Sequence, residues 1–269
     1  MKKGPNDKNY LDLLAIGSLT VDQIIMVDQL PRIHFEANIL LSHTSFGGRA
    51  PNVAVMLAKM GFRTGIVSPV GKDFRRSGHL KHLLSYGIDT RGIVETSENT
   101  MRTIIVAAKD GEQVTLLDIG AAKHFQELRV PLDLVRNTKI VHVSSSGDPQ
   151  FNVSAARKAR ELGVLVSFDV GNDPFGQKQE YLREMIKCAD ILFANDVEVE
   201  SMLHTLDAKS PMDLVKNTPR LFIVMRKEDK RSRIYSSLGV RDIKSLMRPE
   251  SILDLTGTSD AYVAGFLSG

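Results

Sequence analysis

The 269-residue chain contains a single cysteine, Cys188, so an internal disulfide framework is excluded and a reducing compartment is expected. No apolar stretch approaches the ~20 residues that a membrane-spanning helix requires. A formal net charge of +3 is too small to indicate a nucleic-acid partner. The polar segment Met1–Lys8 has no apolar core of the kind found in secretory signals. We therefore expect a soluble, cytoplasmic protein that binds neither membranes nor nucleic acid.

Two common nucleotide-binding fingerprints are also missing. No Gly-x-x-x-x-Gly-Lys-Ser/Thr loop occurs, which excludes a P-loop site. Gly17 stands alone where a dinucleotide-binding site would have Gly-x-Gly-x-x-Gly after the first strand. His79 and His82 are three residues apart but have no cysteine or carboxylate partner at a metal-ligand spacing. We assign this pair a surface or packing role, so no histidine metal site is expected.

Short apolar runs and helical patterns alternate regularly along the chain. The runs are typical of parallel strands covered on both faces, and they lie at residues 13–18, 64–68, 139–144, 164–169, 191–194 and 221–225. Helices followed by a glycine stop are predicted at residues 51–60, 74–86 and 153–162. This alternation predicts an α/β fold with a doubly wound, mostly parallel sheet flanked by helices.

Two stretches break this alternation, at about residues 23–46 and 100–118. Both alternate apolar and polar side chains and show no helical face. The second contains Asp110-Gly111, which is a strong hairpin signal. We predict that they form a small β-sheet projecting from the edge of the main sheet.

The end of the chain joins a turn of small residues to an apolar helix. Thr256, Gly257, Thr258 and Ser259 lead into Asp260, which is expected in the first helical turn. The N–H groups and the positive dipole end of a helix start favour anions. A carboxylate at that place suits the removal of a proton from a hydroxyl while the backbone holds a phosphoryl group. The alternative is that Ser259 or Asp260 simply caps the helix.

The segment Asp254-Leu255-Thr256-Gly257-Thr258-Ser259-Asp260 resembles the C-terminal signature of ribokinase-like carbohydrate kinases, the phosphofructokinase B family. The usual form of that signature is Asp-Thr-x-Gly-Ala-Gly-Asp. Other segments resemble further motifs of the family, in the same order: residues 15–22, 46–54, 70–73 with 87–89, 169–172 and 195–198. The resemblance spans residues 11–269.

The resemblance implies one ribokinase-like α/β domain over residues 1–269, with the small sheet as a lid over the substrate and as a possible homodimer contact. It also implies an ATP- and Mg²⁺-dependent kinase that phosphorylates a hydroxyl of a sugar or a sugar-containing substrate. Because the chain stops two turns into the signature helix, where family members continue, we expect its C-terminal end to be truncated.

The resemblance gives each motif a role. Asp260 would be the general base, and Gly257, Thr258 and Ser259 would form an anion hole in the turn over residues 256–260. The predicted substrate-binding residues are Asp22, Gly47, Gly48 and Asn52. The predicted nucleotide-binding residues are Asn172, Asn195, Arg226, Thr256 and Gly257. Glu198 and Asn195 would hold Mg²⁺ through water, and Asp169 is a further candidate.

Plainer roles stay open for several of these residues. Asp22 is expected at the end of the first strand, where α/β sheets place their ligand crevice, but it could be an ordinary turn residue. Gly47 and Gly48 could form only a turn before a helix. Asn195 and Glu198 have the spacing of a helix capping box, a role compatible with metal binding.

The chain departs from the family pattern at several positions. Ser259 replaces a usual glycine, and Glu228 and Arg231 replace the glycines of a loop against which the nucleotide lies. Ser144–Gly147 stands where many sugar-specific members carry a glutamate. These departures leave two alternatives to a sugar kinase, namely a nucleoside kinase of the same family and a non-catalytic sugar- or nucleotide-binding member.

Overall fold

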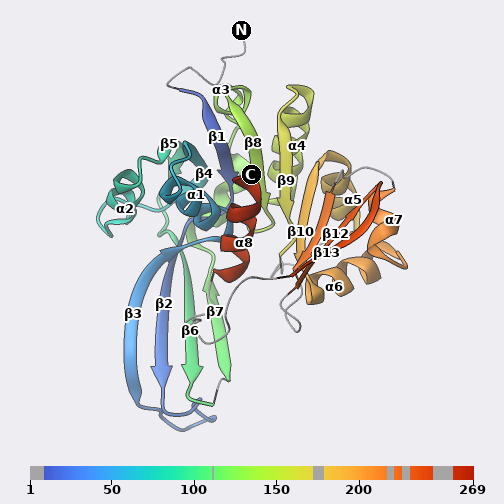
Figure 1. The fold of residues 1–269 in the computed structure, drawn as a ribbon. Coiled ribbons are helices and arrows are strands. Elements are labelled where there is room, and N and C mark those ends of the chain that lie inside the picture. The colour runs from blue at the N-terminus through green and yellow to red at the C-terminus, as the bar shows by residue number, and fades with distance from the viewer. Residues whose placement is uncertain (1–8, 111, 172–178, 217–220, 226–230, 245–256) are drawn as a thin grey trace.

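The structure, a computed structural model, describes residues 9–110, 112–171, 179–216, 221–225, 231–244 and 257–269. Two β-sheets organise these residues (Figure 1). The larger has the strand order β13-β12-β11-β10-β9-β8-β1-β4-β5. Its strands are β1 (Leu11–Ile16), β4 (Thr64–Val70), β5 (Asp89–Glu95), β8 (Thr138–Ser144), β9 (Leu165–Asp169), β10 (Ile191–Asn195), β11 (Leu221–Met225), β12 (Arg231–Ser236) and β13 (Gly239–Lys244).

The large sheet is parallel from β11 to β5, and only β12 and β13 are added antiparallel. β1 is central, with Leu13 opposite Thr64 on one neighbour and Ile140 on the other. All six predicted strands are present in this sheet. They were recognisable because strands covered on both faces are almost wholly apolar.

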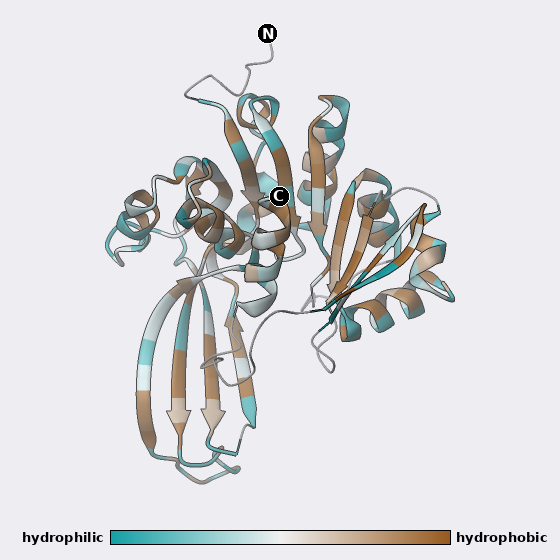
Figure 2. Cartoon of the chain, in the orientation of Figure 1, coloured by the Kyte–Doolittle hydropathy of each residue, from teal (hydrophilic) through white to brown (hydrophobic). Residues whose placement is uncertain are grey.

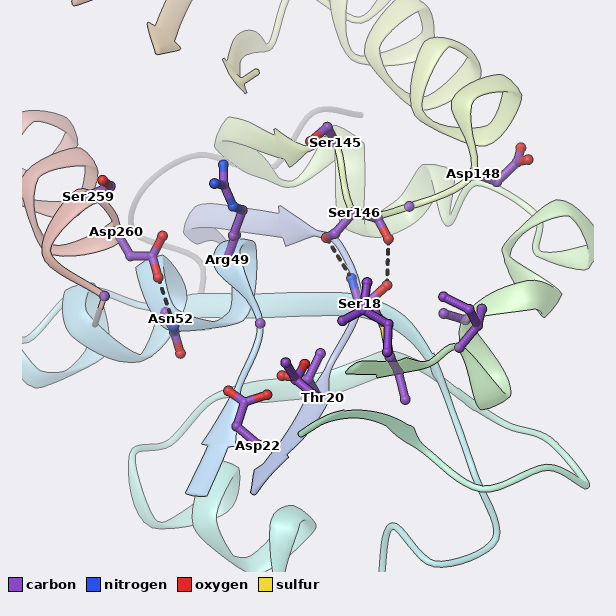
Figure 3. A pocket seen from close by; sticks show the side chains of 18 of the residues that line it. Ser18, Thr20, Asp22, Arg49, Asn52, Ser145, Ser146, Asp148, Ser259 and Asp260 are labelled. Carbon is purple, nitrogen blue, oxygen red and sulfur yellow. Dashed lines mark hydrogen bonds between the residues drawn. The ribbon is translucent and has the colours of Figure 1, made fainter. Parts of the chain in front are cut away.

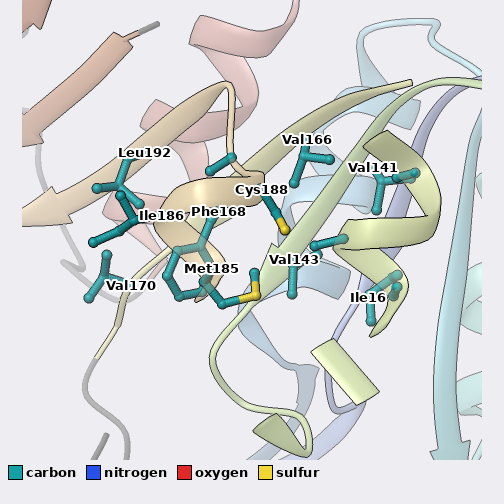
Figure 4. Packing of buried hydrophobic residues seen from close by; sticks show 14 of the residues in the cluster. Ile16, Val141, Val143, Val166, Phe168, Val170, Met185, Ile186, Cys188 and Leu192 are labelled. Atoms are coloured by element: carbon teal, nitrogen blue, oxygen red, sulfur yellow. The ribbon is translucent and has the colours of Figure 1, made fainter. Parts of the chain in front are cut away.

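Helices cover both faces of the large sheet, as the alternating pattern predicts. They are α1 (Arg49–Lys59), α2 (His79–Ser85), the 3₁₀ helix η1 (Gly120–Glu127), α3 (Leu132–Arg136), α4 (Pro149–Glu161), α5 (Gln179–Cys188), α6 (Asp196–Leu206), α7 (Pro211–Val215) and α8 (Thr258–Leu267). One buried cluster joins the sheet to α3–α7, and a second joins it to α1, α2 and α8. Figure 4 shows part of the first cluster, in which Cys188 is buried among apolar side chains. The doubly wound α/β fold is therefore confirmed.

The three predicted helices begin at other residues than predicted, α1 by two residues, at Arg49, and the other two by four or five. α4 starts at Pro149 and not at residue 153, because the Asp148 side chain accepts a hydrogen bond from the Phe151 N–H at 2.8 Å and proline suits the first turn. α2 starts at His79 and not at residue 74, because Gly78 is left-handed with φ of 87° and separates the preceding turn from the helix.

The small sheet has the order β3-β2-β6-β7 and consists of β2 (Thr20–Val27), β3 (Ile39–Gly47), β6 (Met101–Ala108) and β7 (Gln113–Asp118). β2 and β6 are parallel, and the outer pairs are antiparallel. The sequence analysis predicted that this sheet projects from the edge of the main sheet, and this prediction is wrong. Figure 1 shows it beyond the carboxyl end of β1, because β2 follows β1 after residues 17–19.

Strand alternation gives the small sheet two different faces. Asp22, Thr103 and Leu117 lie directly opposite one another on β2, β6 and β7 and share the face that lines a cleft described below. Val114 and Leu116 belong to the other face and are exposed. Figure 2 shows the apolar residues distributed along these strands.

None of the helices within the described residues combines the length and the apolar composition that crossing a bilayer requires.

Candidate functional site

A cleft of about 610 Å³ lies between the small sheet and the carboxyl end of the large sheet (Figure 3). Its walls come from β2, β6 and β7, from the starts of α1 and α8, and from the segment after β8. The cleft brings together residues that the sequence places far apart. Those that were predicted as site residues and line it are Asp22, Gly48, Asn52, Gly257, Thr258, Ser259 and Asp260.

Asp260 is a buried residue in the first turn of α8 and lies at one end of the cleft. Gly257 precedes the helix in a left-handed conformation with φ of 74°, which a residue with a side chain would adopt only under strain. The Asp260 carboxylate accepts a hydrogen bond from the Asn52 side-chain N–H at 2.7 Å. Burial raises the pKa of Asp260, whereas the Asn52 hydrogen bond and the charge of Arg49 lower it.

The alternative that Ser259 or Asp260 simply caps this helix is not supported by a hydrogen bond among the described residues. No side-chain cap is formed at Gly257, and the Asp260 carboxylate is directed to Asn52 on α1. Within the described part of the chain, the Ser259 hydroxyl makes no capping bond either. The start of α8 thus lines the cleft, and its carboxylate Asp260 is bound by Asn52.

Asp22 lies elsewhere than the sequence analysis placed it. It is the third residue of β2 in the small sheet and not the end of the first strand, because β1 stops at Ile16 and the chain turns at residues 17–19 into the second sheet. The Thr20 and Thr103 side chains lie beside this carboxylate. Burial raises the pKa of Asp22, and the neighbouring Thr20 and Thr103 hydroxyls reduce this increase. Asp22 thus stands half-buried on the cleft wall, beside two hydroxyl groups.

Gly47 and Gly48, the two glycines before α1, each occupy a position where a side chain would clash, but with different neighbours. A Cβ on Gly47 would lie 2.1 Å from Asp22 Oδ2, so this residue leaves room for the carboxylate and lies behind it, not among the residues that line the cleft. Gly48 has φ of 113°, and a Cβ there would lie 2.1 Å from the Ser18 carbonyl oxygen. Gly48 lines the cleft and caps α1, which carries Asn52 in its first turns.

Arg49, which the sequence analysis did not single out, joins three segments at the cleft. Its guanidinium donates to Asp169 Oδ2 at 3.3 Å and to Glu198 Oε1 at 3.1 Å. Burial raises the pKa of Asp169 to about 7 even though the Arg49 charge acts in the opposite direction. Burial alone would lower the pKa of Arg49, but Asp169 and Glu198 outweigh it and raise that pKa. The double glycine just before Arg49 was the available signal, but its partners lie 120 and 149 residues away.

Asn195 and Glu198 form the capping box that their spacing indicated. The Asn195 side chain accepts from the Glu198 N–H at 3.0 Å, and Glu198 Oε2 accepts from the Asn195 N–H at 2.9 Å. Both residues are buried and do not line the cleft. Glu198 is connected to it through Arg49.

The opposite end of the cleft holds residues that the sequence analysis missed. Ser18 and Ser146 bind each other, since the Ser18 hydroxyl donates to the Ser146 carbonyl at 2.6 Å and the Ser146 hydroxyl accepts from the Ser18 N–H at 3.3 Å. An apolar wall completes this end; its members are Met101, Ile105, Leu117, Ile119 and Ala122. Ser18 lies in the motif segment 15–22 and Ser146 in the segment 144–147, but neither was assigned to the site, and no sequence motif marks the apolar wall.

Several predicted residues are not placed at the cleft. Asn172, Arg226 and Thr256 lie outside the described residues, as does Glu228. Arg231 starts β12, pairs with Lys244 in the sheet and does not line the cleft. Their predicted roles stay predictions.

Comparison with known proteins gives concordant matches. The sequence profile of the pfkB family carbohydrate kinases matches residues 11–269. The nucleoside kinase of Methanothermobacter thermautotrophicus is 33% identical over 257 residues, which is 95% of this chain and 81% of that protein. The ATP-dependent ribose-1-phosphate kinase of Halopiger xanaduensis is 30% identical, over 95% of this chain and 83% of that protein.

A solved structure agrees in fold as well as in sequence. The crystal structure of the nucleoside kinase of Methanocaldococcus jannaschii, an archaeal member of the ribokinase family, superposes with a TM-score of 0.88 at 33% identity. The match covers 96% of this chain and 84% of that one.

Proposed function

The chain belongs to the pfkB family of carbohydrate kinases, and from this premise we propose that it transfers the terminal phosphoryl group of ATP to a sugar hydroxyl of a nucleoside. Its relatives in Methanothermobacter and Methanocaldococcus are nucleoside kinases, and the relative in Halopiger is ATP-dependent. The observation that carries the proposal is that Asp260 and Asp22, 238 positions apart in the sequence, line one cleft together with the start of α8.

The two carboxylates have different tasks in this proposal. Asp22, which lies beside Thr20 and Thr103, accepts hydrogen bonds from two neighbouring ribose hydroxyls and so fixes the acceptor. Asp260 takes the proton of the attacking hydroxyl as a bond forms between that oxygen and the γ-phosphorus. The bond between this phosphorus and the β–γ bridging oxygen breaks, and ADP leaves. Asn52 keeps the Asp260 carboxylate oriented toward the cleft through its hydrogen bond.

The start of α8 supplies the anion hole. The backbone N–H groups of the first turn and the positive end of the helix dipole favour the phosphoryl oxygens, which carry the negative charge in the transition state. The left-handed Gly257 lets the backbone turn into the helix without a side chain in the way. Ser259 replaces the usual glycine and is half-buried. The Asp260 carboxylate still accepts its hydrogen bond from Asn52.

The apolar wall favours a nucleoside over a free sugar. A ribose needs only the polar end with Asp22 and Asn52, whereas Met101, Ile105 and Leu117 offer apolar surface beyond it. A nucleobase attached to the ribose would bury this surface, with a gain of roughly 25 cal/mol per Å² of apolar area removed from water. The cleft volume of about 610 Å³ lies within the usual range for small-molecule sites.

The described residues fit Mg²⁺ only through water. Both carboxylate oxygens of Glu198 already bind protein donors, and the Asn195 side-chain oxygen accepts from the Glu198 N–H. Among the described residues no group of three His, Cys, Asp or Glu side chains could enclose a metal ion. Glu198 and Asn195 would therefore orient metal-bound waters, as is usual for Mg²⁺ held largely by phosphates. Bound with the nucleotide, Mg²⁺ would neutralise phosphate charge.

The small sheet is proposed as the lid over the acceptor. It supplies Asp22, Thr103 and most of the apolar wall, namely Met101, Ile105 and Leu117, so its approach to the large sheet would exclude water from the phosphoryl group. The exposed Val114 and Leu116 on its other face support the predicted homodimer contact. A cytoplasmic location likewise remains a prediction.

A panel assay for ADP release tests the proposed function. The acceptors are ribose, fructose, fructose 6-phosphate, ribose 1-phosphate and a set of nucleosides, each with ATP and Mg²⁺. We expect the highest kcat/KM with a nucleoside, because only nucleosides use both the Asp22 end and the apolar wall. Higher kcat/KM with a free sugar would contradict the nucleoside assignment. Measurable acceptor binding without ADP release from any acceptor would instead favour a non-catalytic binding protein.

A further inference from the structure

Arg49 is a cation placed among carboxylates at the rim of the cleft (Figure 3). Its side chain is 34% exposed, while those of its partners Asp169 and Glu198 are 4% and 2% exposed. The two acidic groups are therefore shielded from solvent, and Arg49 is the member of the unit that reaches the cleft. We define Arg49, Asp169 and Glu198 as the Arg49 unit.

The surroundings of the Arg49 side chain match the shape of a guanidinium group. Nη1 and Nη2 each bind a different carboxylate, which uses the fork of the arginine side chain. A Cβ on Gly171 would lie 2.1 Å from Nη1, so the residue just after β9 leaves space for the guanidinium. The position thus selects for the shape of arginine as well as for its charge.

The charge balance at this place matters for a phosphate ligand. With both carboxylates ionised, the Arg49 unit carries one net negative charge, and Asp260 lies close enough to interact with Arg49 and Glu198. Without Arg49, the uncompensated negative charge of the two carboxylates would repel an incoming triphosphate in the solvent-filled cleft. The other cation on the described cleft wall, Lys123, is ion-paired with Glu98 at 2.7 Å.

We propose that Arg49 is a positioning residue for the nucleotide: it offsets one of the two negative charges of Asp169 and Glu198 and binds both carboxylates, so that the cleft accepts a triphosphate beside Asp260. This inference rests on the proposed kinase function and deepens it. Arg49 affects ATP binding through the charge of the two carboxylates. It does not take part in acceptor binding, which is the proposed role of Asp22.

The test compares variants that change the charge of the unit in a defined way. Counted with both carboxylates ionised, Arg49→Met changes the net charge of the unit from −1 to −2, and Arg49→Met/Asp169→Asn returns it to −1. Arg49→Lys keeps the charge of the wild type but loses the fork. Binding of ATP in EDTA is measured by calorimetry at low and high salt, beside binding of the neutral probes adenosine, cytidine and inosine. Using metal-free ATP separates the charge of Arg49 from that of Mg²⁺.

We expect Arg49→Met to weaken ATP binding at least about tenfold at low salt and less at high salt, because added salt screens the repulsion. The double variant should bind ATP within about threefold of the wild type, and nucleoside binding should stay within about threefold throughout. A purely structural role would weaken both ligands together and would not be rescued by removing a carboxylate. If Arg49→Met alone fails to fold, the double variant and Arg49→Lys still decide the question through their ATP affinity and its salt dependence.

Two results would overturn the inference. One is ATP affinity in folded Arg49→Met equal to that of the wild type, and the other is a double variant that binds ATP as poorly as the single one. Where Arg49→Met does not fold, a double variant that binds ATP at least tenfold more weakly than the wild type overturns it equally. Failure of the wild-type protein itself to bind ATP would count against the proposed function instead.

Discussion

Replacing Asp260 with asparagine is expected to lower kcat at least about a hundredfold while leaving ligand binding nearly unchanged. Asparagine has the same size and can still accept the Asn52 hydrogen bond, which measures 2.7 Å in the wild-type protein. It cannot take the proton of the attacking hydroxyl, and general base catalysis is typically worth about 10²–10⁴-fold. Steady-state ADP release and calorimetric binding of acceptor and ATP measure the two effects separately.

Asp133→Asn is the matched control, because Asp133 lies exposed on α3 away from the cleft and undergoes the same chemical change. It should keep the wild-type rate. Equal turnover by the wild type and Asp260→Asn would remove Asp260 from the mechanism. A large loss of acceptor affinity in Asp260→Asn would assign it to binding and not to proton transfer.

Replacing Asp22 with asparagine should raise the KM for the acceptor at least about tenfold and leave the KM for ATP close to that of the wild type. Hydrogen bonds to a charged group contribute about 1.5–3 kcal/mol each, and asparagine offers one acceptor atom where the carboxylate offers two. Asp22 is half-buried on β2 beside Thr20 and Thr103. A water molecule therefore cannot easily replace its hydrogen bonds to the acceptor. Initial rates over a matrix of acceptor and ATP concentrations separate the two KM values.

Gly47→Ala should reproduce part of this effect without touching the carboxylate itself, since the new methyl group would lie 2.1 Å from Asp22 Oδ2 and displace it. Gly265→Ala is the matched control, because a Cβ there meets nothing within 4 Å. An acceptor KM unchanged in both Asp22→Asn and Gly47→Ala would show that the acceptor is held by other residues.

The fold was predictable from local patterns because parallel strands covered on both faces must be apolar along their whole length. The runs that became β4, β8 and β10 illustrate this. The place of the small sheet was less accessible, since the break at residues 17–19 between β1 and β2 sets it and no strong turn signal marks that break. The start of α4 could have been predicted from Asp148-Pro149, a capping residue followed by a first-turn proline.

The candidate site was predictable only where a motif names its residue. Asp260 and Asn52 belong to such motifs, and the structure joins them by one hydrogen bond. Arg49 and its partners could not be paired in advance, because the Arg49–Asp169 contact depends on the order of the strands in the large sheet. The same holds for Thr103, which meets Asp22 only through the pairing of β2 with β6.

A crystal structure of the protein with a nucleoside acceptor and a non-hydrolysable ATP analogue tests the role of Asp260 most directly. One ribose hydroxyl oxygen should lie about 2.6–3.2 Å from the Asp260 carboxylate. That oxygen should be in line with the γ-phosphorus, and Asp22 should bind other hydroxyls of the same ribose. An Asp260 carboxylate turned away from every acceptor hydroxyl, with the γ-phosphate far from the start of α8, would contradict this role.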